Sequence, residues 1–220
     1  MEKKESADKL FSDIKPPSKN KLREFLLAFL KFIIGVCLLP IVYAVSLCFA
    51  QELSKLEPRI IQSFIWGMIG FLVVYLFIWE PAILFKKGQR ILEVVFRFFS
   101  PLVKVAPFVL PIYTLLLFIS YFILISFMNM RESTPAFIFA IGFSLGLHLV
   151  FSAKTLRSKQ GDPFKANYIF GFSWIYILDA ILLAGFFNLA FESFSLINFF
   201  NASYQIVKSI YTALFSQLFL

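Results

Sequence analysis

A single carboxylic acid stands inside an otherwise apolar run of this sequence. Residues 175–185 read IYILDAILLAG, with Asp179 near the centre. In the middle of a membrane-spanning helix an ionised Asp costs about 2.5–3.5 kcal/mol, so such a residue is protonated, paired with a protein group or exposed to a wet cavity. Its type and position therefore predict one of two roles, an interhelical hydrogen bond that fixes assembly or a relay for protons or ions.

Few side chains in the sequence are suited to accompany this acid. Tyr176 precedes Asp179 by three residues, which places both on one side of a helix. His148 is the only histidine, and Ser144, His148 and Ser152 recur at steps of four, a polar stripe along one helix face. With the helix ends predicted below, His148 lies about 8 Å shallower than Asp179 at 1.5 Å per residue. Direct pairing then requires tilt or offset, and a hydroxyl, a backbone carbonyl or another subunit serves equally well as the partner.

Small residues at helical spacing predict where helices approach one another closely. Gly142 and Gly146 form a small-xxx-small pattern, and Ala180 and Ala184 repeat that spacing beside the acid. Such patterns allow two helix backbones to pack against each other in a membrane. We interpret these four residues as helix-packing positions.

Sequence motifs of catalytic chemistry are absent. The chain contains no HExxH, GxSxG, P-loop or GxGxxG pattern. One histidine without an acidic cluster provides too few ligands for a metal site. We therefore expect no enzymatic activity, no metal and no cofactor.

The composition identifies the solvent in which this chain folds. Of the 220 residues, 60% are hydrophobic, only 15% are charged and 31 are Phe. Several stretches of about 20 residues carry almost no charge, which is the length that an α-helix needs to cross ~30 Å of hydrocarbon. The sequence predicts an all-α, polytopic helical membrane protein.

Five membrane-spanning helices can be drawn. They cover residues 25–50, 60–79, 105–128, 135–153 and 168–189. Pro40 and Pro111 fall inside the first and third, where a proline removes a backbone hydrogen bond and kinks the helix. Residues 1–24 are polar and lysine-rich, and we expect them to form a flexible basic tail.

The basic residues predict the orientation. Lys and Arg are concentrated in residues 1–24, 80–104 and 154–167, whereas the alternate connections hold few. The positive-inside rule then places the N-terminus in the cytoplasm and, with five spans, the C-terminus on the outer side, in what we expect to be a bacterial inner membrane. The net charge of +8 thus reflects topology and anionic lipid headgroups and does not indicate nucleic-acid binding.

The segment 80–101 between the second and third spans has the pattern of a surface helix. Its basic residues are expected to contact lipid headgroups on the cytoplasmic side: Lys86, Lys87, Arg90 and Arg97. Ile91, Val95 and Phe98 recur on another face, and Gly88 is a position at which the helix can break into two pieces.

Residues 194–220 carry an unbroken apolar heptad stripe. It consists of Ile197, Phe200, Tyr204, Val207, Tyr211, Leu214 and Leu218. A polar row runs beside it, containing Asn198, Asn201, Gln205, Lys208 and Thr212. A span facing lipid would not carry such a row. The segment therefore lies on the outer surface or against a partner helix, or it is a sixth span shielded by other helices.

These features favour an assembly subunit. The leading hypothesis is an integral inner-membrane subunit that anchors or scaffolds a larger complex of membrane subunits through helix packing, with 194–220 as a principal contact. The alternative is a small transporter or proton- or ion-conducting protein that uses Asp179, with Pro40 and Pro111 as gating kinks.

Overall fold

The described part of the chain is helical throughout, in agreement with the predicted fold class. The computed structural model describes residues 19–78, 80–98, 109–128, 131–158 and 166–219, and no strand occurs among them. The long helices are α2 (Lys19–Leu53), α3 (Pro58–Val73), α4 (Ala82–Val95), α7 (Ile112–Met128), α8 (Thr134–Arg157), α9 (Ala166–Ala190) and α10 (Leu196–Phe219). Short elements are the π-helix η1 (Val74–Ile78) and the 3-10 turns η2 (Phe96–Phe98) and η3 (Arg131–Ser133).

Four of these helices are long and apolar enough to cross a membrane. They are α2 from Lys21 onward, α3 continued by η1, α8 and α9, and α7 adds a shorter apolar helix over Ile112–Ile125. Helices of this length and composition place their apolar side chains in lipid, where only structures with internally satisfied backbones are stable. The protein is a helical membrane protein.

Several predicted boundaries differ from those in the structure. The helix α2 begins at Lys19, so the end of the predicted tail 1–24 is helical, because Lys, Leu, Arg and Glu are good helix formers. Residues 1–18 lie outside the described part.

Pro111 directly precedes α7 and does not lie inside a helix, so its predicted kink is wrong. A proline fits the start of a helix because its missing N–H has no helical partner there. Residues 105–108 of the predicted span are not described.

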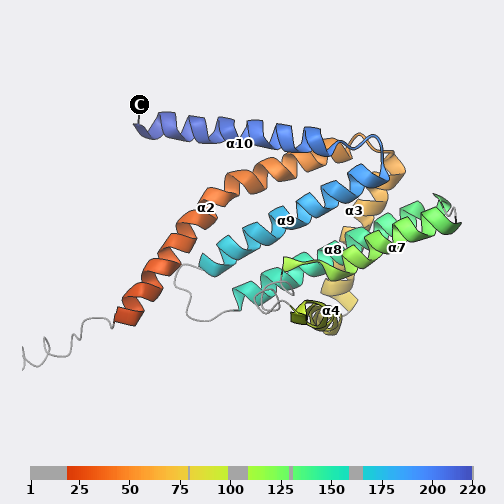
Figure 1. Ribbon diagram of the computed structural model, residues 1–220, viewed down its shortest axis with the longest axis horizontal. Coiled ribbons are helices and arrows are strands. Elements are labelled where there is room, and N and C mark those ends of the chain that lie inside the picture. Colours follow the sequence, from red (N-terminus) through yellow and green to blue (C-terminus); the bar gives the residue numbers. More distant parts are fainter. Residues whose placement is uncertain (1–18, 79, 99–108, 129–130, 159–165, 220) are drawn as a thin grey trace, which may run out of the picture.

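Pro40 does lie inside its helix, as predicted. The helix α2 continues unbroken through this residue for 35 residues, and Figure 1 shows that its path bends along its length. A proline inside a helix bends it because one backbone hydrogen bond is lost.

The helices run alternately up and down, as the predicted spans require. The residue pairs Lys31–Asn167 and Ser46–Tyr176 make α2 parallel to α9. The ring pairs Tyr75–Phe151 and Tyr121–Phe137 place α8 beside η1, which continues α3, and beside α7. Figure 1 shows α7 and α8 running side by side, with α3 crossing them steeply.

The bundle consists of two halves. Its closest helix pairs are α3 with α8 in one half and α2 with α9 in the other, while α8 and α9 form the seam between the halves. An aromatic cluster of Phe49, Phe64, Phe187 and Phe194 joins both halves near one end of the bundle, with ring centroids 5.7–6.3 Å apart.

The helix α4 is continuous through Gly88, contrary to the predicted break. Gly88 is buried against the Tyr113 ring, so its lack of a side chain allows α4 to approach α7. In Figure 1, α4 is seen almost end-on while α8 and α9 run across the view, so α4 crosses them. Its four basic positions are all exposed, at Lys86, Lys87 and Arg90 in α4 and Arg97 in η2.

Candidate functional site

Asp179 and His148 lie opposite each other across the seam between α9 and α8. Oδ2 of Asp179 is 3.6 Å from Nε2 of His148, and the two side chains are 2% and 6% exposed. The contact for which the sequence required tilt or offset is therefore present. The helix α8 continues four residues past its predicted end to Arg157, but α9 begins two residues early, at Ala166. Counted along the helices, Asp179 is still about 6 Å deeper than His148, and the offset between α8 and α9 closes this difference.

The imidazole ring of His148 is oriented by the backbone. The ring hydrogen-bonds to the backbone of Val109, just before α7. Of its two nitrogens, only Nε2 lacks a hydrogen-bond partner, so the contact with Val109 occupies Nδ1. In a neutral ring this contact makes Nδ1 the donor and leaves a lone pair on Nε2, directed toward Asp179.

The acid and the imidazole nitrogen have no other partner among the described residues. Neither Oδ1 nor Oδ2 of Asp179, nor Nε2 of His148, is within hydrogen-bonding distance of another polar atom. Burying a polar group without a partner is costly, and burying an unpaired charge is more so. The two side chains are thus the natural partners of each other.

The neighbouring hydroxyls are engaged elsewhere. The Ser144 hydroxyl, on the predicted stripe with His148, lies 2.9 Å from the Thr114 hydroxyl of α7. The Tyr176 hydroxyl lies 2.7 Å from that of Ser46 in α2 and does not bond Asp179. Thr114 and Ser46 were not identified from the sequence, since one hydroxyl in an apolar run gives no periodic signal.

Each side chain of the pair lines one hollow. Asp179 lines one of about 120 Å³, together with Tyr176, Phe49, Phe64, Met68, Leu145, Leu149, Ala180 and Leu183. His148 lines another of about 10 Å³, together with Phe85, Gln89, Leu110, Pro111, Ile112, Tyr113, Ser144 and Leu147. The first has room for several water molecules and the second for about one.

The four predicted helix-packing residues are all buried. A side-chain carbon on Gly142 would overlap the Phe64 carbonyl of α3, and one on Gly146 would contact the Phe71 ring. Gly67 of α3, which the sequence reasoning did not identify, approaches the Phe139 carbonyl in the same way. Ala180 and Ala184 belong to the apolar core between the helices.

The helix α10 packs antiparallel along the second half of α2. Phe199 and Ser203 are buried in this contact, and the Tyr211 hydroxyl donates a hydrogen bond to the backbone carbonyl of Cys37. The predicted apolar stripe coincides with this packed face only in part. Val207 and Tyr211 are half-buried, whereas four other stripe residues are exposed, namely Ile197, Phe200, Tyr204 and Leu214; the side chain of Leu218 lies outside the described part. The polar row of Asn198, Asn201, Gln205, Lys208 and Thr212 is exposed at every position.

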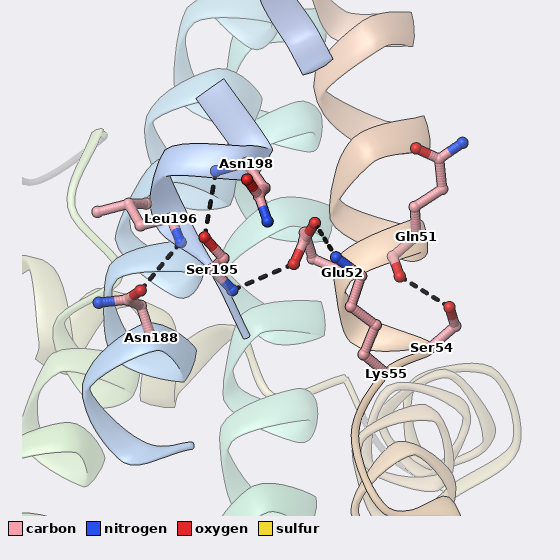
Figure 2. A network of polar contacts seen from close by, with 8 residues as sticks. All are labelled: Gln51, Glu52, Ser54, Lys55, Asn188, Ser195, Leu196 and Asn198. Atoms are coloured by element: carbon pink, nitrogen blue, oxygen red, sulfur yellow. Dashed lines mark hydrogen bonds and ion pairs between the residues drawn. The ribbon is translucent and has the colours of Figure 1, made fainter. Parts of the chain in front are cut away.

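The start of α10 is fixed by side chains from α2 and α9 (Figure 2). The Ser195 N–H donates to Oε2 of Glu52 at 3.1 Å, and the Leu196 N–H donates to Oδ1 of Asn188 at 2.9 Å. The Asn198 N–H donates to the Ser195 hydroxyl at 3.2 Å. These bonds satisfy backbone donors that a helix start leaves free. Glu52 is itself 5% exposed, and it was missed because it follows the last predicted apolar residue of its span.

Fold and site together define a helical membrane protein with a buried acid–histidine pair and an exposed amphipathic helix. Its sequence matches no family model, and neither a curated protein nor a solved structure is similar to it at a significant level.

Proposed function

We propose that the protein is an assembly subunit of a larger membrane complex and that α10 holds a membrane-spanning helix of a partner protein. The observation that carries this proposal is the position of the exposed polar row of α10 beside the apolar helix α2. Three properties of α10 support the proposal: its depth in the membrane, its exposed polar row and the kind of partner that this row fits.

The depth of α10 in the membrane follows from its contacts with α2. It starts where α2 ends, at the contact of Ser195 with Glu52, and it reaches Cys37 through Tyr211. From Cys37 to Leu53, α2 is about 24 Å long at 1.5 Å per residue. Since α2 has the length and hydropathy of a membrane span, a helix that follows it this far enters the hydrocarbon. This supports the sixth-span alternative, with α10 crossing the membrane.

The polar row of α10 would be costly in free energy if it faced lipid. Asn201, Gln205 and Lys208 are exposed on α10, and a Lys near the middle of a membrane helix costs about 2.5–3.5 kcal/mol. Polar side chains within a membrane face other protein groups. Because no described element covers this face, the cover comes from another chain.

The charge of Lys208 favours a different protein, and not a second copy of this chain, as the partner. Two copies of this chain have the same orientation in a membrane, so a two-fold contact through α10 would place Lys208 against Lys208. Like charges at an interface disfavour such a pair. A helix of another protein that carries an Asp or Glu at the depth of Lys208, with amide or hydroxyl groups nearby, satisfies the row instead.

We place this assembly in a bacterial inner membrane, with the N-terminus in the cytoplasm. The exposed basic side chains of α4 and η2 then meet anionic headgroups, each contributing about 1 kcal/mol near the surface. This orientation rests on the distribution of Lys and Arg along the chain.

The proposal is tested by co-purification of the tagged full-length protein from its native membrane in mild detergent. With Lys208→Gln we expect the recovery of one membrane partner to fall about tenfold, the equivalent of 1.4 kcal/mol. The matched control is Gln62→Leu, which changes an exposed polar residue of α3 and should leave recovery unchanged.

Two results count against the proposal. One is a partner that is recovered equally with Lys208→Gln, and the other is a recovered partner without a carboxylate in any membrane-spanning helix. Recovery of a second copy of this chain alone identifies a homo-oligomer and also contradicts it.

A further inference from the structure

The pair of His148 and Asp179 occupies a position that assembly through α10 does not explain. It bridges α8 and α9, which form the seam between the two halves of the bundle. An amide or hydroxyl would suffice for a structural bridge, yet the seam holds two groups that both exchange protons.

The geometry accommodates one proton between the two side chains. Nδ1 of His148 is engaged with Val109, so a neutral ring presents only a lone pair to Asp179. A carboxylate facing that lone pair would be a buried charge without a partner. A protonated carboxyl instead donates its O–H to Nε2, and the present 3.6 Å separation needs to close by about 0.6–0.9 Å.

The larger of the two hollows lies on the Asp179 side of the pair. The hollow beside Asp179 measures about 120 Å³, whereas the one beside His148 measures about 10 Å³. Asp179 and Tyr176 are the polar residues that line the larger hollow, and water that enters it can bond the carboxyl group. The larger hollow thus gives more room for a proton carrier at the carboxyl of Asp179 than the smaller one gives at His148.

No other charged side chain among the described residues lines either hollow. Tyr176 of α9 faces the larger hollow, Tyr113 of α7 and Gln89 of α4 face the smaller one, and α2, α3 and α8 contribute apolar residues and the hydroxyl of Ser144. Tyr113 donates its hydroxyl to the Leu84 carbonyl. The charge at the seam is thus set by the acid and the histidine.

We propose that His148 and Asp179 together form a proton-binding site, loaded through the hollow beside Asp179, whose occupancy determines whether α8 and α9 are bridged. On loading, a proton from water binds Oδ2 and the neutral acid donates to Nε2. On release, that O–H bond breaks, the proton returns to water, and the bridge is replaced by a buried carboxylate. The halves then separate slightly as water enters to solvate the charge.

The experiment uses the full chain in lipid nanodiscs and two probes. Because the chain contains one histidine, isotope labelling of His gives a single imidazole signal by magnetic resonance. Infrared difference spectroscopy reports the C=O stretch of a protonated carboxyl. We expect the neutral Nδ1–H tautomer and a protonated carboxyl at neutral pH, with both signals changing at one midpoint as pH is raised, because interacting groups titrate as a unit.

Variants assign the signals. Asp179→Asn preserves shape and can donate an N–H to Nε2, so the carboxyl band should vanish and the imidazole signal should lose its high-pH transition. Glu192→Gln, at an exposed glutamate between α9 and α10, should change neither signal. If Asp179→Asn does not fold, the wild-type titration decides alone, through coincident or separate midpoints.

Three results would overturn the proposal. They are an ionised Asp179 at neutral pH, a histidine signal that titrates independently of the carboxyl band, and a site whose signals respond to Na⁺ at constant pH. The last would identify a cation site in place of a proton site.

Discussion

The Glu52 carboxylate, at the end of α2, accepts the backbone N–H of Ser195 at 3.1 Å, 143 residues further along the chain. This bond connects the first described helix to the start of the last one (Figure 2). It determines where α10 begins and therefore which part of α2 it follows. Together with the bonds of Leu196 to Asn188 and of Tyr211 to Cys37, this contact sets the orientation of the polar row.

Removing this cap should loosen the start of α10. We expect Glu52→Ala to lower the free energy of unfolding by about 1–2 kcal/mol, because the half-buried backbone N–H of Ser195 loses its acceptor. Hydrogen exchange at Ser195 and Leu196 should accelerate. Glu57→Ala is the control, since Glu57 is exposed and makes no side-chain capping bond; equal exchange in both variants would show that the cap is unimportant.

The contact of Gly142 with the Phe64 carbonyl predicts an asymmetry between glycines. Gly142→Ala should destabilise the protein by about 1–3 kcal/mol, because α3 and α8 must separate to admit the new carbon. Gly185→Ala introduces the same atom where nothing lies within 4 Å and should stabilise α9 by about 0.5–1 kcal/mol. Thermal unfolding in detergent measures both, and a similar response at the two positions would contradict the packing described.

Buried Ser203 offers a test of the interface between α10 and α2. Its hydroxyl has no hydrogen-bond partner among the described residues, so Ser203→Ala should leave stability unchanged or raise it by up to about 1 kcal/mol. Phe199 is fully buried on the same face, and Phe199→Ala should cost about 3–5 kcal/mol. If chemical denaturation shows a tolerant Phe199, α10 does not pack as described.

Much of the fold follows from hydropathy alone, because a helix that crosses lipid needs about 20 apolar residues and basic residues accumulate at the ends. The positions of Asp179 and Gly142 inside such runs were sufficient to mark them as interhelical. Helix ends were less predictable, since polar residues such as those after Ala153 continue a helix as readily as they end one. Even with the observed ends of α8 and α9, a count along the helices leaves His148 about 6 Å from the depth of Asp179, because the offset between two helices is not encoded in either of them.

Two further features depend on tertiary contacts that a single sequence does not encode locally. The apolar stripe of α10 indicated its amphipathic nature but not its packed face, because Phe199 and Ser203 lie beside the stripe and polarity alone does not choose between adjacent faces. Likewise, Gly88 is a weak helix former in isolation, yet in the fold its lack of a side chain allows the Tyr113 ring of α7 to pack against the backbone of α4.

The proposed crossing of α10 places the two termini on the same side of the membrane. A reporter active only in the cytoplasm should be active when fused after Leu220 and inactive when fused after Glu192, in the connection between α9 and α10. This outcome follows because a 24-residue helix is about 36 Å long, enough to cross the hydrocarbon. An inactive reporter at both positions would indicate that α10 lies on the outer surface and does not cross the membrane.

The most direct test of the central claim is photo-crosslinking from α10 in the native membrane. A photoreactive residue at Gln205, in the polar row, should give a crosslink to a carboxylate-bearing membrane helix of another protein, and Lys208→Gln should weaken it. The same probe at Trp66, an exposed apolar position of α3, should give no such product. Adducts from Gln205 with lipid alone, or with a second copy of this chain, would contradict the claim.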